Sequence, residues 1–336
     1  MKNIKLTIIT GFFLLLIFYS CQKDNSSIPD YYKPLIGSWK VEQGLTDGQY
    51  IIFNQDKYCY ELFMQEYNFK TVETALVQAS NGQVFFDGGQ FASSLYNFKI
   101  SHDTLYLTRP DNTIIASRTN SAPAVSDWVT ELNVSGAFNA PLQLRCDIAY
   151  DGGIIWFGNG YDSDYLYKIS LLNGSLDSIP TTQSAWAIER DNTGLWVSND
   201  GYDKVTKISK TTGSTIFTSL SLGSWIYAIA WDGQYLWCYS NSENTLYKYD
   251  PVGDDIISKI TFNNNHEIYG LTYNNGYLYV TFDGDLAKCS LTPFKVIDTY
   301  SLKDHYLYGI TYDGTNFWAN AYNTMTNKYL IVKLGF

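Results

Sequence analysis

A phrase that recurs five times in the C-terminal two-thirds of the chain is the feature that most constrains its fold. In each copy an Asp or Asn lies five residues before an aromatic residue, and successive aromatic positions are 40, 41, 42 and 39 residues apart. The residue after the Asp or Asn is always Gly or Asn, which tolerates the positive φ of a tight turn. Each copy therefore predicts a β-hairpin. The aromatic residues are Trp156, Trp196, Trp237, Tyr279 and Trp318.

Further apolar stretches follow each hairpin. In the third copy they are Leu246–Tyr249 and Ile256–Ile260, which brings the copy to four strands. Four strands in about 40 residues is the period of a β-propeller blade. The sequence therefore predicts an all-β chain in which residues 121–336 form a five-bladed β-propeller. Six or seven blades are the alternatives, and seven would require residues 34–120 to supply two degenerate blades.

The fifth copy reaches Phe336 directly after its third strand, Leu330–Leu334. The segment Trp128–Val134, which precedes the first copy, has strand character. We expect this segment to supply the missing fourth strand, because closing the ring of blades removes exposed strand edges.

Residues 34–120 contain no copy of the phrase and are expected to form a separate small β-barrel. The Gly37-Ser38-Trp39 segment resembles the first strand of lipocalin-like barrels, in which the Trp closes the barrel floor. The stretch Asn120–Ala124 contains Ser and Pro and predicts a linker to the second domain.

The first residues have the features of an export signal. Lys2 and Lys5 precede an apolar run, Leu6–Tyr19, that is too short for a membrane span. Ser20 and Cys21 then resemble the lipobox of bacterial lipoproteins. The resemblance implies a signal peptide at residues 1–20, a lipid on Cys21 and a tether at residues 21–33. An ordinary secretory peptide is the alternative.

The segment Gln22–Asn25 resembles the export tag of lipoproteins that reach the outer face of the outer membrane. We therefore expect a surface-exposed outer-membrane lipoprotein, with the periplasmic face as the alternative. Loss of Lys2 and Lys5 would change the formal charge from -10 to -12. This charge argues against a nucleic-acid partner and leaves the lipid as the contact with the membrane.

The remaining cysteines are widely spaced and form no CxxC pair, so a zinc ribbon is excluded and buried free thiols are expected. Acidic residues in the expected loops match no EF-hand spacing. No metal and no cofactor are predicted. The cysteines are Cys59, Cys146, Cys238 and Cys289.

Polar and aromatic residues precede each copy of the phrase, where the chain would enter the innermost strand of a blade. Loops of this kind share one face of a propeller, and a polar ring with aromatic walls suits a small polar ligand, a sugar or a peptide end. The alternative is that these side chains only decorate loops and pack between blades. The predicted ligand-binding residues are Gln143, Arg145, Asp147, Gln183, Trp186, Trp225, Tyr227, His266, Tyr269, His305, Tyr306 and Tyr308.

His266 and His305 occupy equivalent positions in adjacent copies. Together with Glu267 they could form a metal or acid–base site, since His titrates near neutrality and often binds metals. Shared repeat ancestry explains the coincidence equally simply, and we favour it.

Three short segments resemble the plant and bacterial type of glutaminyl cyclase, a family of five-bladed propellers that converts N-terminal glutamine to pyroglutamate. They are Glu267–Thr272, Phe294–Ile297 and Phe317–Asn320. The resemblance implies Glu267 as a catalytic acid and base, with Tyr269 and His305 shaping the pocket.

Two departures from that family weaken the enzymatic interpretation. Gly309–Thr311 stands where the family has Glu-Leu-Glu, and Cys146–Ile148 stands where it has Gln-Gly-Leu. Acid–base work on an amine needs a placed carboxylate. We therefore favour a non-catalytic envelope lipoprotein that binds a small polar ligand, a glycan or a protein partner. A cyclotransferase-like enzyme and an interaction scaffold are the alternatives.

Overall fold

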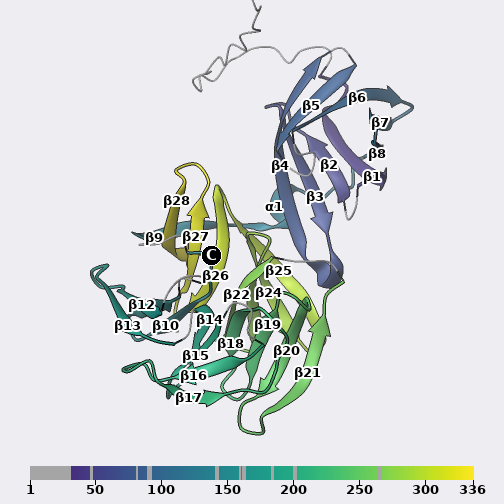
Figure 1. Ribbon diagram of the computed structural model, residues 1–336. Helices are drawn as coiled ribbons and strands as arrows, with labels where there is room; N and C mark the ends of the chain where they lie inside the picture. The colour runs from purple at the N-terminus through teal and green to yellow at the C-terminus, as the bar shows by residue number, and fades with distance from the viewer. Residues whose placement is uncertain are drawn as a thin grey trace, which may run out of the picture.

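The protein is described by a computed structural model over residues 32–45, 48–80, 82–88, 93–140, 144–158, 160, 164–182, 185–199, 203–263 and 267–336. The predicted signal peptide, Cys21 and most of the tether lie outside these residues. Figure 1 shows a barrel in purple and blue beside a group of sheets in teal to yellow. The all-β prediction is confirmed, since the described helices are a four-residue α1 (Val125–Trp128) and a 3₁₀ turn, η1 (Glu66–Asn68).

The first part is a closed eight-stranded barrel in which each strand pairs with the next and β1 pairs antiparallel with β8. This closure confirms a small N-terminal barrel and contradicts the seven-blade alternative, because residues 34–120 are used in one barrel. The strands are β1 (Gly37–Gln43), β2 (Gly48–Phe53), β3 (Tyr58–Met64), β4 (Lys70–Ser80), β5 (Gln83–Gly88), β6 (Ser94–Ser101), β7 (Thr104–Arg109) and β8 (Asn112–Thr119).

Trp39 lies in the barrel core, as its position in the first strand predicted. Its side chain is fully buried, and its indole N–H donates to the Leu35 carbonyl at 2.8 Å. The Arg118 guanidinium lies 4.2 Å from its ring centroid, so the cation covers one face of the indole.

The second part repeats a four-strand unit. Three units are separate four-stranded sheets, and the other two are joined in one eight-stranded sheet. Unit 1 comprises β10 (Ile148–Asp151), β11 (Ile154–Phe157), β12 (Tyr165–Ser170) and β13 (Leu176–Pro180); unit 2 comprises β14 (Ala185–Arg190), β15 (Leu195–Asn199), β16 (Val205–Ile208) and β17 (Thr215–Thr218). Unit 3 comprises β18 (Ile226–Trp231), β19 (Leu236–Ser240), β20 (Thr245–Asp250) and β21 (Asp255–Thr261); unit 4 comprises β22 (Ile268–Asn274), β23 (Tyr277–Phe282), β24 (Asp285–Leu291) and β25 (Phe294–Leu302).

Unit 5 draws its strands from both ends of this part of the chain. It comprises β26 (His305–Tyr312), β27 (Phe317–Asn323), β28 (Lys328–Gly335) and β9 (Thr130–Asn139). Strand β9 pairs antiparallel with β28, as the sequence predicted, and also pairs in parallel with β25 of unit 4. The predicted segment began two residues too early, because Trp128 belongs to α1.

The first strands of the five units lie against one another in chain order, and β26 of unit 5 contacts β10 of unit 1. We call this arrangement of units the sheet ring. Each first strand runs from one end of the sheet ring to its Asp or Asn turn at the other end.

The five-residue spacing of the repeated phrase has a direct structural cause. The indole N–H groups of Trp196, Trp237 and Trp318 donate to the Asp that opens each hairpin turn, at 2.9, 3.0 and 2.8 Å. The other carboxylate oxygen of each Asp accepts backbone N–H groups of its own turn. One side chain therefore holds both the turn and the second strand of the hairpin.

The first copy departs from this arrangement. Asp151 forms ion pairs with Arg190 at 3.0 Å and Lys210 at 2.7 Å, both from unit 2. The indole Nε1 of Trp156 is consequently buried without a hydrogen-bond partner.

The barrel and the sheet ring meet at the tip of the β3–β4 hairpin (Figure 1). Phe69 is fully buried there, with its ring centroid 4.4 Å from that of Phe282 in unit 4. The Tyr67 hydroxyl donates to the Thr261 carbonyl at 3.1 Å. On the other side Trp128 donates to the Phe63 carbonyl at 3.0 Å.

All four cysteines outside the signal region are buried free thiols, as the sequence predicted. Among the described residues no helix combines the length and apolar character needed to cross a membrane.

Candidate functional site

Aromatic side chains gather at the end of the sheet ring where the first strands begin. Trp186 stacks on Tyr227 with ring centroids 4.9 Å apart, and Tyr227 stacks on Tyr269 at 5.7 Å. Tyr269 meets Tyr308 edge to face at 5.3 Å. These contacts link units 2, 3, 4 and 5 in a continuous series. With their neighbours they form the aromatic array, defined as Trp186, Trp225, Tyr227, Tyr269, Tyr306, Tyr308 and Tyr329.

The members of the array differ in their exposure to solvent. Trp186, Tyr227 and Tyr308 are buried, because neighbouring rings cover their faces. Trp225 is 44% exposed and adopts a positive φ of 58°, with its ring stacked on Tyr227. Some of the aromatic side chains thus pack between units, as the alternative interpretation predicted, whereas Trp225 faces solvent.

Small residues close the space beneath the array. The position that Asp147 occupies in unit 1 is held by Ala187, Ala228, Gly270 and Gly309 in the other units. A Cβ at Gly309 would lie 2.6 Å from the Cys146 carbonyl oxygen, and one at Gly270 would lie 2.7 Å from the Gly309 Cα. The first strands therefore approach too closely here for larger side chains in units 4 and 5.

Asp147 was predicted to bind ligand, but it lies in this floor and is fully buried. One carboxylate oxygen accepts the N–H groups of Ile148 and Ile310, at 3.0 and 3.2 Å. The other accepts those of Ile229 and Leu271, at 3.2 and 3.3 Å. Burial raises the pKa of Asp147 well above its usual range, although the bonds from backbone N–H groups act to lower it. These bonds come from units 1, 3, 4 and 5, so Asp147 ties the units together beneath the array.

Glu267 lies at the edge of the array and is exposed. The Tyr306 hydroxyl donates to its Oε2 at 2.5 Å, and its backbone N–H donates to Asp283 at 2.9 Å. Gly284 packs against Tyr306 with a φ of 90°, and a Cβ there would come within 2.6 Å of the aromatic ring. Burial, and then the Glu267 carboxylate, raise the pKa of the Tyr306 hydroxyl, so this group stays a donor.

Arg145 supplies a positive charge to the same end of the sheet ring. Its Nε donates to the Tyr329 hydroxyl at 2.9 Å, and its side chain is exposed. Burial raises the pKa of Tyr269 to about 12, with Glu267 raising and Arg145 lowering it. The pKa of Tyr308 is also raised to about 12 by burial and is subject to the same two charges. The neutral hydroxyl groups of Tyr269 and Tyr308 therefore interact electrostatically with both the Arg145 cation and the Glu267 anion.

His305 lies at the start of β26, but both of its ring nitrogens are engaged within unit 5. Nδ1 lies 2.7 Å from the Lys303 carbonyl oxygen, and Nε2 lies 2.9 Å from the Asn323 amide nitrogen. This pattern fits a neutral imidazole that donates from Nδ1, so His305 holds the hairpin of its own unit.

Three predicted ligand-binding residues, Gln143, Gln183 and His266, lie outside the described residues. No group of three or more His, Cys, Asp or Glu side chains suited to a metal ion occurs among the residues described.

Two residues that position parts of the candidate site were missed by the sequence analysis. Tyr329 orients Arg145, but it lies in a third strand, away from the residues that precede the repeated phrase. Asn320 is fully buried and donates to the Cys146 carbonyl at 2.8 Å, so it joins unit 5 to unit 1. Its place in the Phe317–Asn320 segment was the available signal.

Comparison with solved structures gives a likeness of fold. The chain is similar to the glutaminyl cyclase of Myxococcus xanthus, with a TM-score of 0.51 and 11% identity over 61% of this chain and 96% of that one. Hydrazine synthase of Kuenenia stuttgartiensis has a TM-score of 0.39 and 14% identity, over 55% of this chain and 57% of that one. The Pan2 WD40 domain of Neurospora crassa has a TM-score of 0.36 and 10% identity, over 92% of each chain.

At this identity the likeness to glutaminyl cyclase concerns the fold alone. No protein-family model matches the chain, and no curated protein matches its sequence.

Proposed function

We propose that the sheet ring is a five-bladed β-propeller that carries its recognition site on the aromatic array. The five four-strand units, the mutual contacts of their first strands and the use of β9 as the fourth strand of unit 5 support this interpretation. The likeness of fold to a glutaminyl cyclase supports it as well.

The ligand that suits the array best is a small polar molecule with a free amino group, such as a peptide N-terminus. The observation that carries this proposal is the exposed Glu267 carboxylate, fixed by Tyr306 at the edge of the aromatic side chains. A carboxylate beside aromatic faces attracts an ammonium group through charge and cation–π interaction. The Arg145 guanidinium provides a complementary site for a carboxylate or amide oxygen of the ligand.

Binding without catalysis is the favoured role. General acid–base catalysis on an amine needs a carboxylate held in position at the reacting group. Glu267 is exposed, and Asp147 is enclosed by four backbone N–H groups in the floor. The Gly309–Thr311 segment places no carboxylate on β26.

The test uses the dipeptide Gln-Ala and the full chain purified in detergent. Calorimetric binding should be lost with N-acetyl-Gln-Ala and weakened about tenfold or more by Glu267→Gln, because both changes remove the amine–carboxylate pair. Ammonia should not be released. Absence of binding by Gln-Ala to the folded chain would refute the proposal.

The second candidate is a glutaminyl cyclotransferase, favoured by the fold likeness. In that reaction the α-amine attacks the side-chain amide carbon, one C–N bond forms, the other breaks and ammonia leaves. Glu267 would accept the amine proton and return it to the leaving group. Ammonia release from Gln-Ala that Glu267→Gln abolishes would establish this enzyme and overturn the binding role.

We also propose that the mature chain is anchored in the outer membrane through a lipid on Cys21 and faces outward. The lipobox-like residues and the tag-like Gln22–Asn25 segment support this proposal. Incorporation of labelled palmitate should disappear in Cys21→Ser, and protease added to intact cells should cleave the wild-type chain. Labelling that persists in Cys21→Ser would contradict lipidation at this residue.

A further inference from the structure

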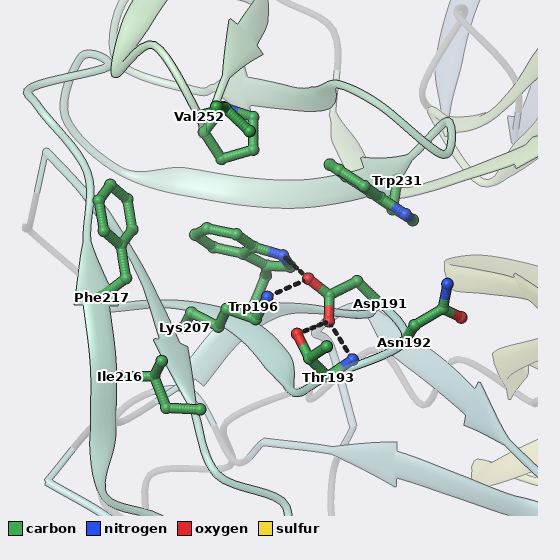
Figure 2. A pocket seen from close by; sticks show the side chains of 10 residues that line it. Asp191, Asn192, Thr193, Trp196, Lys207, Ile216, Phe217, Trp231 and Val252 are labelled. Carbon is green, nitrogen blue, oxygen red and sulfur yellow. Dashed lines mark hydrogen bonds and ion pairs between the residues drawn. The ribbon is translucent and has the colours of Figure 1, made fainter.

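A pocket of about 430 Å³ lies between units 2 and 3, and none of the predicted site residues lines it. It is remote from the aromatic array because β14 runs from Trp186 at the array to Arg190, directly before the pocket residue Asp191. Figure 2 shows Trp196 between Phe217 and Trp231, with Val252 above it. The volume falls within the range of about 300–1,000 Å³ that is usual for small-ligand sites.

The repeat explains why this boundary between units is hollow. At the boundary of units 1 and 2, Arg190 and Lys210 both pair with Asp151. Arg190 and Trp231 each pair with the residue before the Trp of their hairpin, so the two residues are equivalent in units 2 and 3.

Trp231 thus replaces Arg190 at this boundary. The register of the third strands shows that a second cation, Lys210, is also replaced. Ile208 and Tyr249 pair with equivalent residues of β15 and β19, so Lys210 and Pro251 are equivalent two residues later. An indole and a Pro ring therefore stand where unit 2 has two cations. Neither can reach across to the Asp of the preceding unit as an ion pair.

Asp191 is equivalent to Asp151, but its side chain forms its bonds within its own unit. Its carboxylate accepts from Thr193, from the Trp196 indole at 2.9 Å and from Lys207 at 2.5 Å. Figure 2 shows these bonds as dashed lines that meet at Asp191. The charges in the lining therefore neutralise each other, and a charged ligand would find no counter-ion.

The rest of the lining has the composition of a sugar site. Trp231 and Phe217 are half-buried and provide apolar faces, while Trp196 closes the floor at 2% exposure. The Asn192 amide and the Trp231 indole N–H form no hydrogen bond within the described part of the chain. Pyranose rings present an apolar C–H face and hydroxyl edges, which aromatic faces beside neutral hydrogen-bonding groups can match.

We propose that this pocket, between units 2 and 3, binds a neutral pyranose sugar. The inference is independent of the proposed recognition of amines at the aromatic array, because the two sites share no residue and lie at opposite ends of the first strands.

The test is saturation-transfer NMR of the full chain with the methyl glycosides of glucose, galactose and mannose at about 10 mM. At least one should give saturation transfer, with a dissociation constant on the order of 1 mM. Trp231→Ala should weaken binding about tenfold or more, and Trp231→Phe should retain part of it. Glu267→Gln, at the array, is the control and should leave sugar binding unchanged.

A double variant introduces between units 2 and 3 the two residues that the protein has between units 1 and 2. Trp231→Arg with Pro251→Lys restores the two cations of the preceding boundary and should abolish sugar binding while the chain still unfolds cooperatively. If no glycoside binds the wild type, the proposal fails. It also fails if binding survives in Trp231→Ala and in the double variant, or depends on Glu267 instead.

Discussion

At the scale of single residues, Asp147 shows how a buried acidic side chain can organise a repeated fold. The four other units carry Ala or Gly at its position, so there is room for one larger side chain at the centre. Its side chain accepts a hydrogen bond from an N–H group that lies 163 residues further along the chain. The same residue closes the floor beneath the aromatic array.

Asp147→Asn should therefore destabilise the protein by about 3 kcal/mol, because the amide NH₂ would face backbone N–H groups and leave them unpaired. Chemical denaturation of the full chain measures the change. Asp255→Asn, at an exposed position on β21, is the control and should change the free energy of unfolding by less than about 0.5 kcal/mol. A similarly small effect for Asp147→Asn would show that the four N–H groups do not depend on the acidic side chain.

At the scale of elements, the hairpins of three units share a bond between the Asp of the turn and the Trp of the second strand. This bond is present in units 2, 3 and 5. In unit 1 the Asp pairs with unit 2 instead, so a contact within a unit is exchanged for one between units.

The two hairpins offer a matched comparison of Trp→Phe substitutions. Trp318 donates to Asp313, whereas the Trp156 indole N–H is buried without a partner, and the exposures of the two side chains are 7% and 3%. Trp318→Phe should cost about 1–2 kcal/mol more than Trp156→Phe, because only the first removes a hydrogen bond. Equal losses in denaturant unfolding would show that the indole–carboxylate bond contributes little.

At the scale of the whole molecule, the barrel is joined to the sheet ring by the β3–β4 hairpin and α1. Phe69 of the barrel belongs to the same apolar cluster as Phe262 and Phe282 of the sheet ring. The two parts therefore share a core and are expected to unfold together.

Phe69→Ala should weaken this coupling by about 3–5 kcal/mol, the usual cost of removing a buried Phe ring. Calorimetry should then resolve two transitions where the wild type shows one. Tyr67→Phe removes only the hydroxyl bond to Thr261 and should keep a single transition. A single, unshifted transition in Phe69→Ala would mean that the joint does not couple the parts.

The free energy of unfolding should also depend on pH, because an acidic residue with a raised pKa lies at this joint. The pKa of Asp285 is raised from 3.8 to about 7, mainly by burial and also by the carboxylates of Asp283 and of Glu73 in the barrel, while a hydrogen bond with Ser301 acts to lower it. The folded state thus holds the proton more tightly than the unfolded state. Stability should be fully present below about pH 4 and should fall as the pH rises to about 7.

Asp285→Asn removes the ionisation and should flatten the pH dependence by about 2–4 kcal/mol between pH 5 and 8. Thermal unfolding at several pH values measures this change. An unchanged slope in the variant would assign the pH dependence to other groups, such as Glu189, whose pKa is raised to about 8 by burial.

The sequence by itself determined the local features of this protein. The Asp-to-Trp spacing specified the hairpins, because that interval lets one side chain bond both the turn and the second strand. Apolar alternation located the third strands and β9, and Gly37-Ser38-Trp39 indicated the barrel. The aromatic array followed from counting back along the repeat, although nothing local indicated that Tyr329 would orient Arg145.

Only the tertiary structure decided the features that join distant segments. Asp147 reads as a ligand-binding residue in the sequence, and its burial becomes evident only when four units bring their N–H groups to it. The sequence likewise contains Trp231 and Pro251 without showing that their replacement of two cations leaves a pocket. Turns and strands depend on neighbours within a few residues, whereas burial, charge pairing and cavities depend on which units meet when the sheet ring closes.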